Sequence, residues 1–204
     1  MLEAACALFL ERGYEVNMAA VARTARVSKQ TVYSHFGTKE ALFRQAVEQL
    51  MRPVLQLLGE GDQDAIASAL QRFATQHLAR TLDPQTVALS RRLVAEADRF
   101  PQAAAALFAA SADQVRGWLA RRLAGAAARG ELDLAHTAGD AGMAAEILLG
   151  MLAGLDADRR RLGLPVREGL ARQRWIDTVI AMFLSLFGTP STRGAPPTPS
   201  GLPG

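Results

Sequence analysis

The sequence is poor in three residue types that often build reactive sites. Among its 204 residues it has one cysteine, Cys6, and three histidines, and only two of its 23 basic residues are lysines. One cysteine excludes an intrachain disulfide, and no cluster of Cys and His is spaced to hold zinc. We therefore expect a protein of a reducing cytoplasm, with neither a bound metal nor a cofactor. Cys6 shares helical spacing with Leu2 and Phe9, which predicts a core position.

Long apolar runs are also missing. The two most apolar stretches, "AGMAAEILLGMLAGL" and "WIDTVIAMFLSLF", are 15 and 13 residues long, and each contains an acidic residue. A membrane span needs about 20 apolar residues. The first residues, "MLEAACALFLERG", lack the basic start of a signal peptide. We expect no membrane partner and a cytoplasmic location.

Familiar catalytic motifs are absent as well. The chain contains no GxGxxG, GxxxxGK[ST], HExxH or GxSxG, and His35, His77 and His136 have no matching nucleophile nearby in sequence. We therefore do not expect an enzyme. A helical enzyme stays open as an alternative of another class, and so does a bundle with a purely structural role.

The residues that are present predict an all-α fold. Helical periodicity recurs between Gly- and Pro-rich stops, whereas strand-like alternation is rare. A small domain of short helices is expected at 1–50, a larger helical domain at 51–187, and a disordered tail rich in Pro and Gly at 188–204. Pro53 should kink or end its helix. Helices are expected at 1–12, 18–25, 29–36, 39–57, 63–82, 85–98, 101–128, 137–156 and 167–187, and the run "DADRRR" at 156–161 is expected to be a solvated loop.

Residues 18–37, "MAAVARTARVSKQTVYSHFG", have the pattern of a helix-turn-helix. Val32 and Phe36 are four residues apart and give the second helix an inward face. Asn17 and Ser28 are suited to cap the first and second helix. Polar side chains that can donate hydrogen bonds to phosphates or base edges face outward on the second helix: Lys29, Gln30 and Ser34, with Thr31, Tyr33 and His35 at the edges.

Positive charge is concentrated in the same region. Residues 18–44 hold five cations and one anion, a balance of +4, while the whole chain has a net charge of +3. Both lysines, Lys29 and Lys39, lie here. Thr38 is suited to cap the next helix, which places Lys39 in its first turn. A cation there opposes the helix dipole, and a phosphate would compensate, so we expect both lysines beside a DNA backbone.

Three segments of the chain are "LFLERGY", "VARTARVSKQTVYSHF" and "TKEALF". They occur in the order found in the TetR family of bacterial transcriptional regulators, and residues 2–47 resemble the DNA-binding domain of that family. The resemblance implies that Lys29, Gln30, Tyr33, Ser34 and His35 lie on the recognition helix. It also implies phosphate contacts by Thr31, Tyr33 and Lys39, and a capping role beside the DNA for Asn17.

Three features depart from the family pattern. Arg26 stands at a turn position where many relatives have glycine, the connection 13–18 is about one residue short, and no basic stretch precedes the first helix. A start upstream of Met1 and a weaker grip on phosphate are both compatible with the last feature. Residues 82–134 further resemble the C-terminal domain of the AefR-like branch, through "ALSRRLVAEADRFP" and "AAARGEL".

Two helices of the larger domain are apolar on more than one side, which predicts a two-fold, four-helix interface between two copies of the chain. The expected interface residues are Met143, Ile147, Gly150, Met151, Gly154, Ile176, Ile180, Phe183 and Phe187. A small apolar or amphipathic effector is expected in a cavity lined by Phe73, His77, Trp118 and Met151. Together these features predict a homodimeric, ligand-responsive repressor on a palindromic double-stranded DNA operator, with an activator on the same scaffold as the alternative.

Overall fold

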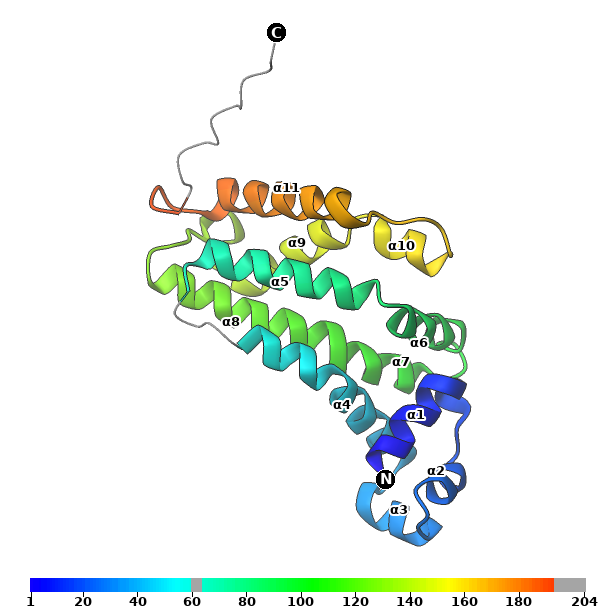
Figure 1. The fold of residues 1–204 in the computed structure, drawn as a ribbon. Helices are drawn as coiled ribbons and strands as arrows, with labels where there is room; N and C mark the ends of the chain where they lie inside the picture. Colours follow the sequence, from blue (N-terminus) through cyan, green and yellow to red (C-terminus); the bar gives the residue numbers. More distant parts are fainter. Residues whose placement is uncertain (60–63, 193–204) are drawn as a thin grey trace.

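The fold is helical throughout the part of the chain that the computed structural model describes (Figure 1). The described backbone covers residues 1–59 and 64–192, and side chains are described over the same ranges except at 51–59 and 93. These residues form no β-strand, only an isolated bridge between Leu132 and Gly188. The all-α prediction is confirmed. No helix of the described residues is both long and apolar enough to cross a membrane.

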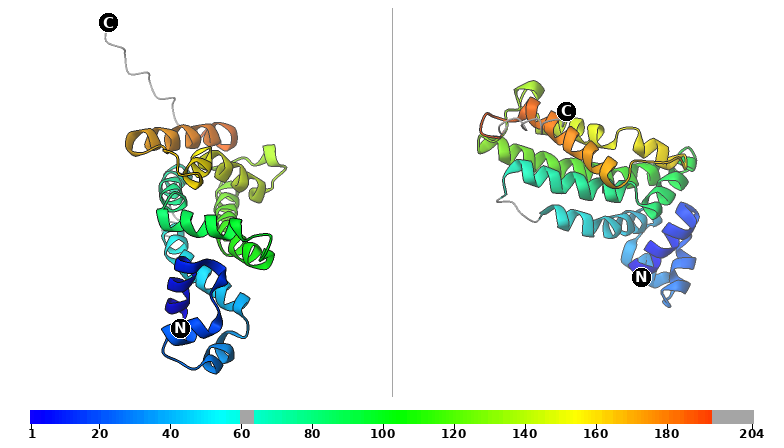
Figure 2. Two further views of the ribbon diagram at one scale, coloured as in Figure 1. Left: turned by 90° about the vertical axis from the view of Figure 1, so that its right-hand side faces the viewer. Right: turned by 45° about the horizontal axis from the view of Figure 1, so that its top comes forward.

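Four helices form a small unit, called the head below, that projects from one end of the molecule (Figure 2). They are α1 (Leu2–Arg12), α2 (Met18–Thr24), α3 (Lys29–Phe36) and the first part of α4 (Lys39–Gly59), with a 3-10 turn at Gly13–Glu15. Phe9 and Phe43 meet edge to face in its core, with ring centroids 4.9 Å apart. The fourth helix is not ended by Pro53, since α4 continues to Gly59.

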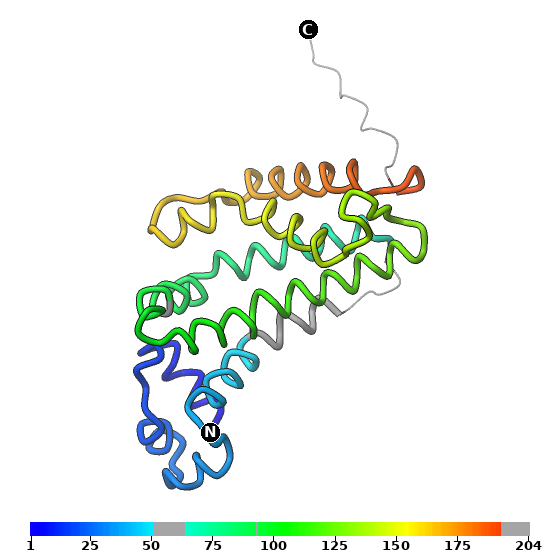
Figure 3. The backbone as a smooth tube through the Cα atoms, turned by 180° about the vertical axis from the view of Figure 1, so that it is seen from behind, coloured from blue at the N-terminus to red at the C-terminus, as the bar shows by residue number. Residues whose placement is uncertain are grey.

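The remaining helices form a larger unit, called the body, and the nearly continuous helical segment 101–128 runs along its length (Figure 3). Its core joins apolar residues of α5, α8, α9 and α11. The helices of the body are α5 (Ile66–Thr81), α6 (Pro84–Ala95), α7 (Pro101–Phe108), α8 (Gln114–Ala128), α9 (Ala141–Ala153), α10 (Asp156–Arg161) and α11 (Gly169–Phe187), with a π-helical turn at Ala109–Asp113 and a 3-10 turn at Ala135–Thr137.

The structure corrects two predicted segments of the body. The helix expected at 101–128 is interrupted by the π-helical turn. The run at 156–161 is a helix, α10, and its first residue, Asp156, is buried. Burial is possible because the Asp156 carboxylate accepts a hydrogen bond from the backbone N–H of Arg167 at 3.2 Å and pairs with the Arg167 guanidinium at 3.0 Å. A buried charge needs such partners, and sequence periodicity does not reveal them.

The start of the expected tail is ordered. Gly188 forms the bridge to Leu132, and the Thr189 hydroxyl donates to the carbonyl of Gly130 at 2.8 Å. Thr192 likewise donates to the carbonyl of Glu131 at 2.6 Å. The first five tail residues therefore fasten the end of α11 to the loop after α8. The rest of the predicted tail, 193–204, lies outside the described residues.

The head and the body share a core. The apolar cluster of the head includes Leu89 of α6, Ala103 of α7 and Ala110 of the π-helical turn. The α7 helix and the π-helical turn lie along α4, and α6 lies against α1. Movement of these body helices would therefore move the head, because close-packed cores transmit displacement.

Candidate nucleic-acid interface and cavity

The N-terminal ends of α2 and α3 are capped by side chains that the sequence predicts for this role. The Asn17 side chain accepts from the backbone N–H of Ala20 at 2.8 Å, and Ser28 accepts from Thr31 at 3.0 Å. Both predicted caps are confirmed, and each satisfies an N–H that lacks a partner within the helix. Arg26 lies in the left-handed region, with φ at 56°. This is the turn position that glycine would occupy without strain.

The α3 helix turns two apolar residues inward and its polar residues outward. Val32 and Phe36 are buried in the head, which fixes the rotation of the helix about its axis. All six predicted recognition residues are exposed: Lys29, Gln30, Thr31, Tyr33, Ser34 and His35. The helix lies at the end of the molecule farthest from α11 (Figure 1). An exposed helix of this kind can enter the major groove of DNA, which is about 12 Å wide.

The cations around α3 are accessible. Arg23, Arg26, Lys29 and Arg44 are all exposed on the head. The Lys29 ammonium lies 5.6 Å from the centroid of the Tyr33 ring, one helical turn away. This surface therefore carries both positive charges and hydrogen-bond donors, and proteins use both to bind the phosphates of the DNA backbone.

Lys39 occupies a more enclosed position than the sequence suggests. Its ammonium lies 4.0 Å from the centroid of the Tyr14 ring and 5.6 Å from that of Phe100, a residue of the turn before α7. Burial lowers the pKa of Lys39, and the carboxylate of Glu40 acts in the opposite sense. The predicted cap of this helix is present, since Thr38 accepts from the N–H of Ala41 at 3.1 Å. Lys39 thus lies where the head, the body and the expected DNA backbone would meet.

Charged contacts reinforce this junction. The Arg99 guanidinium pairs with the carboxylate of Glu15 at 2.5 Å. Arg92 of α6 donates to the carbonyls of Leu10 and Glu11 at the end of α1. Basic residues suit the negative end of a helix dipole, so Arg92 both caps α1 and ties it to the body.

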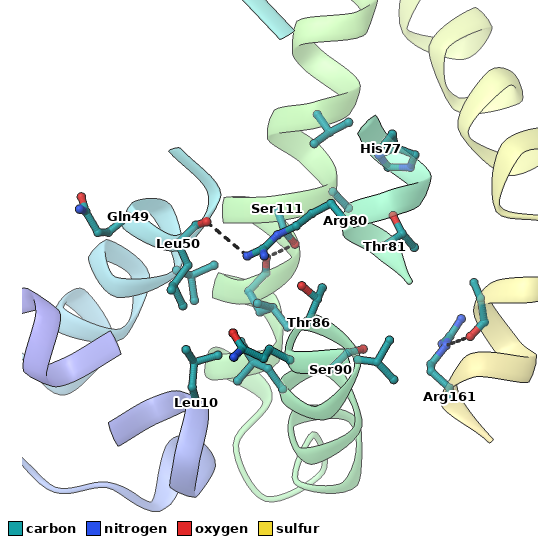
Figure 4. A pocket seen from close by; sticks show the side chains of 18 of the residues that line it. Leu10, Gln49, Leu50, His77, Arg80, Thr81, Thr86, Ser90, Ser111 and Arg161 are labelled. Atoms are coloured by element: carbon teal, nitrogen blue, oxygen red, sulfur yellow. Dashed lines mark hydrogen bonds between the residues drawn. The ribbon is translucent and has the colours of Figure 1, made fainter. Parts of the chain in front are cut away.

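A cavity of about 760 Å³ lies between the head and the body (Figure 4). It is bordered by α1 and α4 on the head side and by α5, α6, α8 and α9 on the body side. Its volume is in the range of small-molecule sites. Most of its lining is apolar and comes from Leu10, Val47, Leu50, Val87, Leu89, Leu107, Val115, Leu149 and Ala153.

Of the four predicted ligand residues, His77 alone lines this cavity. Phe73 is buried in the body core, while Trp118 and Met151 pack against it. The Phe73 ring stacks between the others, 5.3 Å from His77 and 5.6 Å from Trp118. The side chains that periodicity selected as apolar are therefore mainly structural. Desolvation lowers the pKa of His77 to about 4, so its imidazole is uncharged near neutral pH.

The lining also contains polar residues that the sequence prediction missed, among them Arg80, Thr81, Thr86, Ser90 and Ser111. They come from three separate segments, so no local motif joins them. A weak signal exists in α5, since Arg80 lies three residues after His77 on the same side of the helix.

The predicted interface between two copies needs correction at four positions. Ile176, Ile180, Phe183 and Phe187 are buried in the core of a single subunit and cannot form an exposed surface. Gly154 is partly buried and faces Trp175 of the same chain, whose ring would lie 3.0 Å from an added Cβ atom, and its place at the interface stays a prediction. The aromatic stripe of α11 turned inward because large rings gain the most from burial.

Other predicted interface residues remain accessible. Met143 and Ile147 of α9 are 51% and 36% exposed, Gly150 is exposed, and Met151 is partly buried. On α11 the large exposed apolar side chains are Leu170, Met182 and Leu186, at 77%, 56% and 42%. The outer sides of α9 and α11 thus carry an apolar surface, called the α9/α11 surface below.

Comparisons with known proteins agree with this architecture. Residues 1–46 match the family model of bacterial regulatory proteins of the tetR family, and residues 68–189 match that of the AefR-like transcriptional repressor C-terminal domain. No curated protein sequence matches the chain.

Solved structures extend the likeness over nearly the whole chain. A protein from Mesorhizobium loti assigned to the TetR family is 29% identical, with 92% of this chain and 95% of that chain covered and a TM-score of 0.72. The flavonoid-responsive regulator FrrA is 29% identical, with 93% and 95% covered and a TM-score of 0.76. A TetR regulator from Agrobacterium tumefaciens shares the fold at 21% identity, with 94% of both chains covered and a TM-score of 0.75.

The two family matches follow one another along the chain, and the first contains the capped helix-turn-helix with its exposed polar residues. Such proteins are regulators that bind DNA and are not enzymes. The chain therefore belongs to the TetR family of DNA-binding transcriptional regulators.

Proposed function

We propose that the protein is a ligand-responsive repressor that binds a palindromic operator as a homodimer. The exposed polar side of α3 is the observation that carries this proposal. In the proposed complex Lys29, Gln30 and Ser34 reach base edges in the major groove, with His35 beside them. Thr31, Tyr33, Lys39 and Asn17 lie along the phosphates. In this proposal, binding over a promoter excludes RNA polymerase. Bacterial DNA lies in the cytoplasm, so the protein would act there.

The α9/α11 surface supports the dimer. Met143 and Ile147 of one helix and Met182 and Leu186 of the other are large apolar side chains exposed to solvent in the single subunit. Two copies related by a two-fold axis would bury this surface in a four-helix contact. Two α3 helices about 34 to 36 Å apart would then enter successive major grooves, which requires an inverted repeat in the operator.

The cavity supports control by a small molecule. It lies between helices of the head and helices of the body, so an occupant would contact both. The relative FrrA is described as flavonoid-responsive, which favours an amphipathic effector here as well. A coupling free energy of about 1 to 3 kcal/mol would change operator affinity about 5- to 150-fold. An activator could use the same parts, and a reporter gene in a deletion strain separates the two roles.

A variant of the recognition helix tests the proposal. Gln30→Ala should change which base pairs are preferred, because in the proposed complex the exposed amide of Gln30 reads base edges and not phosphates. The measurement is selection from a randomised DNA pool by the wild type and the variant. Arg72→Ala serves as the control, since it removes an exposed charge from α5 in the body. An unchanged preference in Gln30→Ala would remove this residue from the DNA interface.

A further inference from the structure

One cation in the cavity has unused binding capacity. Arg80 extends from α5 toward α4, and its Nη2 atom donates to the carbonyl of Leu50 at 3.3 Å (Figure 4). The nearest carboxylate that pairs with it, Asp83, is 3.9 Å from Nη1. The Nε–H group of Arg80 is buried and finds no acceptor in the described part of the chain. A buried donor without an acceptor destabilises the fold.

The contact between Arg80 and α4 is a single hydrogen bond to a backbone carbonyl. A carbonyl oxygen has two lone pairs, so the carbonyl of Leu50 can accept from Arg80 in addition to its helical hydrogen bond. This contact joins the first helix of the body to the helix that leads out of the head.

The other charged residues in the described lining are Arg161 and Glu3, and neither forms an ion pair with Arg80. Arg161 is itself a cation, and it pairs with Asp158 at 2.8 Å. Glu3 is the one carboxylate among the described lining residues, and it lies on α1 of the head, where it is exposed. The remaining polar lining is uncharged near neutral pH and consists of Gln49, His77, Thr81, Gln85, Thr86, Ser90 and Ser111. The cavity thus combines apolar walls with a guanidinium whose ion pair with Asp83 is long, at 3.9 Å.

We infer that the cavity binds an amphipathic organic monoanion, with its apolar part against Leu107, Val115 and Leu149 and its acidic group on the guanidinium of Arg80. This inference rests on the proposed function and names the chemical class of the effector. An acidic group can accept two parallel hydrogen bonds from Nε and Nη2 of one arginine. It would satisfy the orphaned Nε–H, and its second oxygen would accept the Nη2 hydrogen on the same side as Nε–H.

Two fluorescent probes of matched skeleton test the class. The anion 1-anilinonaphthalene-8-sulfonate and the neutral N-phenyl-1-naphthylamine differ by the sulfonate, and both report binding by fluorescence without DNA present. The wild type should bind the anion at least about tenfold more tightly, the ratio that one charge-assisted contact supplies. In Arg80→Gln this preference should vanish through weaker binding of the anion, with the affinity for the neutral probe changed less than about twofold.

Controls locate the probe and protect the test against misfolding. Arg72→Gln removes a charge from the same helix outside the cavity and should leave both affinities unchanged. Ser90→Trp fills the cavity and should abolish binding of both probes. If Arg80→Gln binds neither probe, the variant Arg80→Lys separates misfolding from loss of the contact. Lysine keeps the positive charge but lacks the planar pair of donors, so Arg80→Lys should bind the anion more weakly and leave the affinity for the neutral probe unchanged.

Three results would overturn the inference: equal affinities for the two probes in the wild type, an anion affinity that neither substitution at Arg80 changes, or anion binding that persists in Ser90→Trp. Operator selection by the same wild-type preparation is measured separately. A protein that selects an operator but ignores the sulfonate would refute the effector class and leave the DNA-binding proposal intact.

Discussion

Removal of the Lys39 ammonium should weaken DNA binding without changing its sequence preference. In Lys39→Ala the expected loss is one phosphate contact, because the residue stands in the first turn of α4 beside the exposed surface of α3. Each such contact contributes about 0.9 to the slope of log K against log salt. From about 50 to about 200 mM salt, the wild type should therefore lose about 3.5-fold more affinity than the variant.

The substitution also acts on the folded protein, and the two effects can be separated. The ammonium rests 4.0 Å from the Tyr14 ring centroid, a contact that contributes about 0.5 to 1 kcal/mol at a partly exposed site. Its removal also relieves a few tenths of a kcal/mol of conflict with the helix dipole. The unfolding free energy should thus fall by about 0.5 kcal/mol, too little to unfold the head at 25 °C.

The assay is fluorescence anisotropy with one palindromic and one random duplex at four salt concentrations, beside thermal unfolding. Arg72→Ala is the matched control, because it removes one charge from the body. A salt slope equal to that of the wild type, together with reduced stability, would refute the phosphate contact. Lys39 would then act by holding Tyr14 and Phe100 together.

Four further substitutions test other parts of the account. Arg26→Gly should raise the unfolding free energy by about 1 kcal/mol in thermal denaturation, because the left-handed φ of 56° strains a side-chain-bearing residue. Phe183→Ala should lower the unfolding free energy by about 3 to 5 kcal/mol, whereas Met182→Glu should keep a folded subunit and shift sedimentation from dimer to monomer. The pKa of His77 in the folded protein, about 4, lies below that in the unfolded chain, about 6.5. The unfolding free energy should therefore be constant with respect to this group above about pH 6.5 and should fall as the pH drops toward 4. In urea unfolding, His77→Gln should remove up to about 3 kcal/mol of that decrease.

Local features of the head were predictable because each depends on residues close together in sequence. Asn17 and Ser28 cap the helices that directly follow them, and Val32 and Phe36 share one face by helical spacing. Charge clustering likewise needs only the order of residues. Lys39 is the exception, since its contact with Phe100 joins residues 61 positions apart.

The body was less predictable because its decisive contacts are long-range. Periodicity showed that α11 is apolar on several sides, but not which side the subunit itself buries, so Phe183 and Phe187 were placed at the surface between copies. Asp156 is buried by a partner eleven residues away, and Arg80 meets a carbonyl thirty residues away. Such pairings depend on how the helices pack, which single-sequence patterns do not encode.

The central claim is that the exposed polar side of α3 reads an inverted repeat as part of a two-fold dimer. Selection of genomic fragments by the purified protein, at low and moderate salt, tests it most directly. We predict that the recovered fragments share one inverted repeat with half-sites about one helical turn apart, and that regulated genes lie beside it. Equal binding of random and genomic fragments at every salt concentration would contradict the claim.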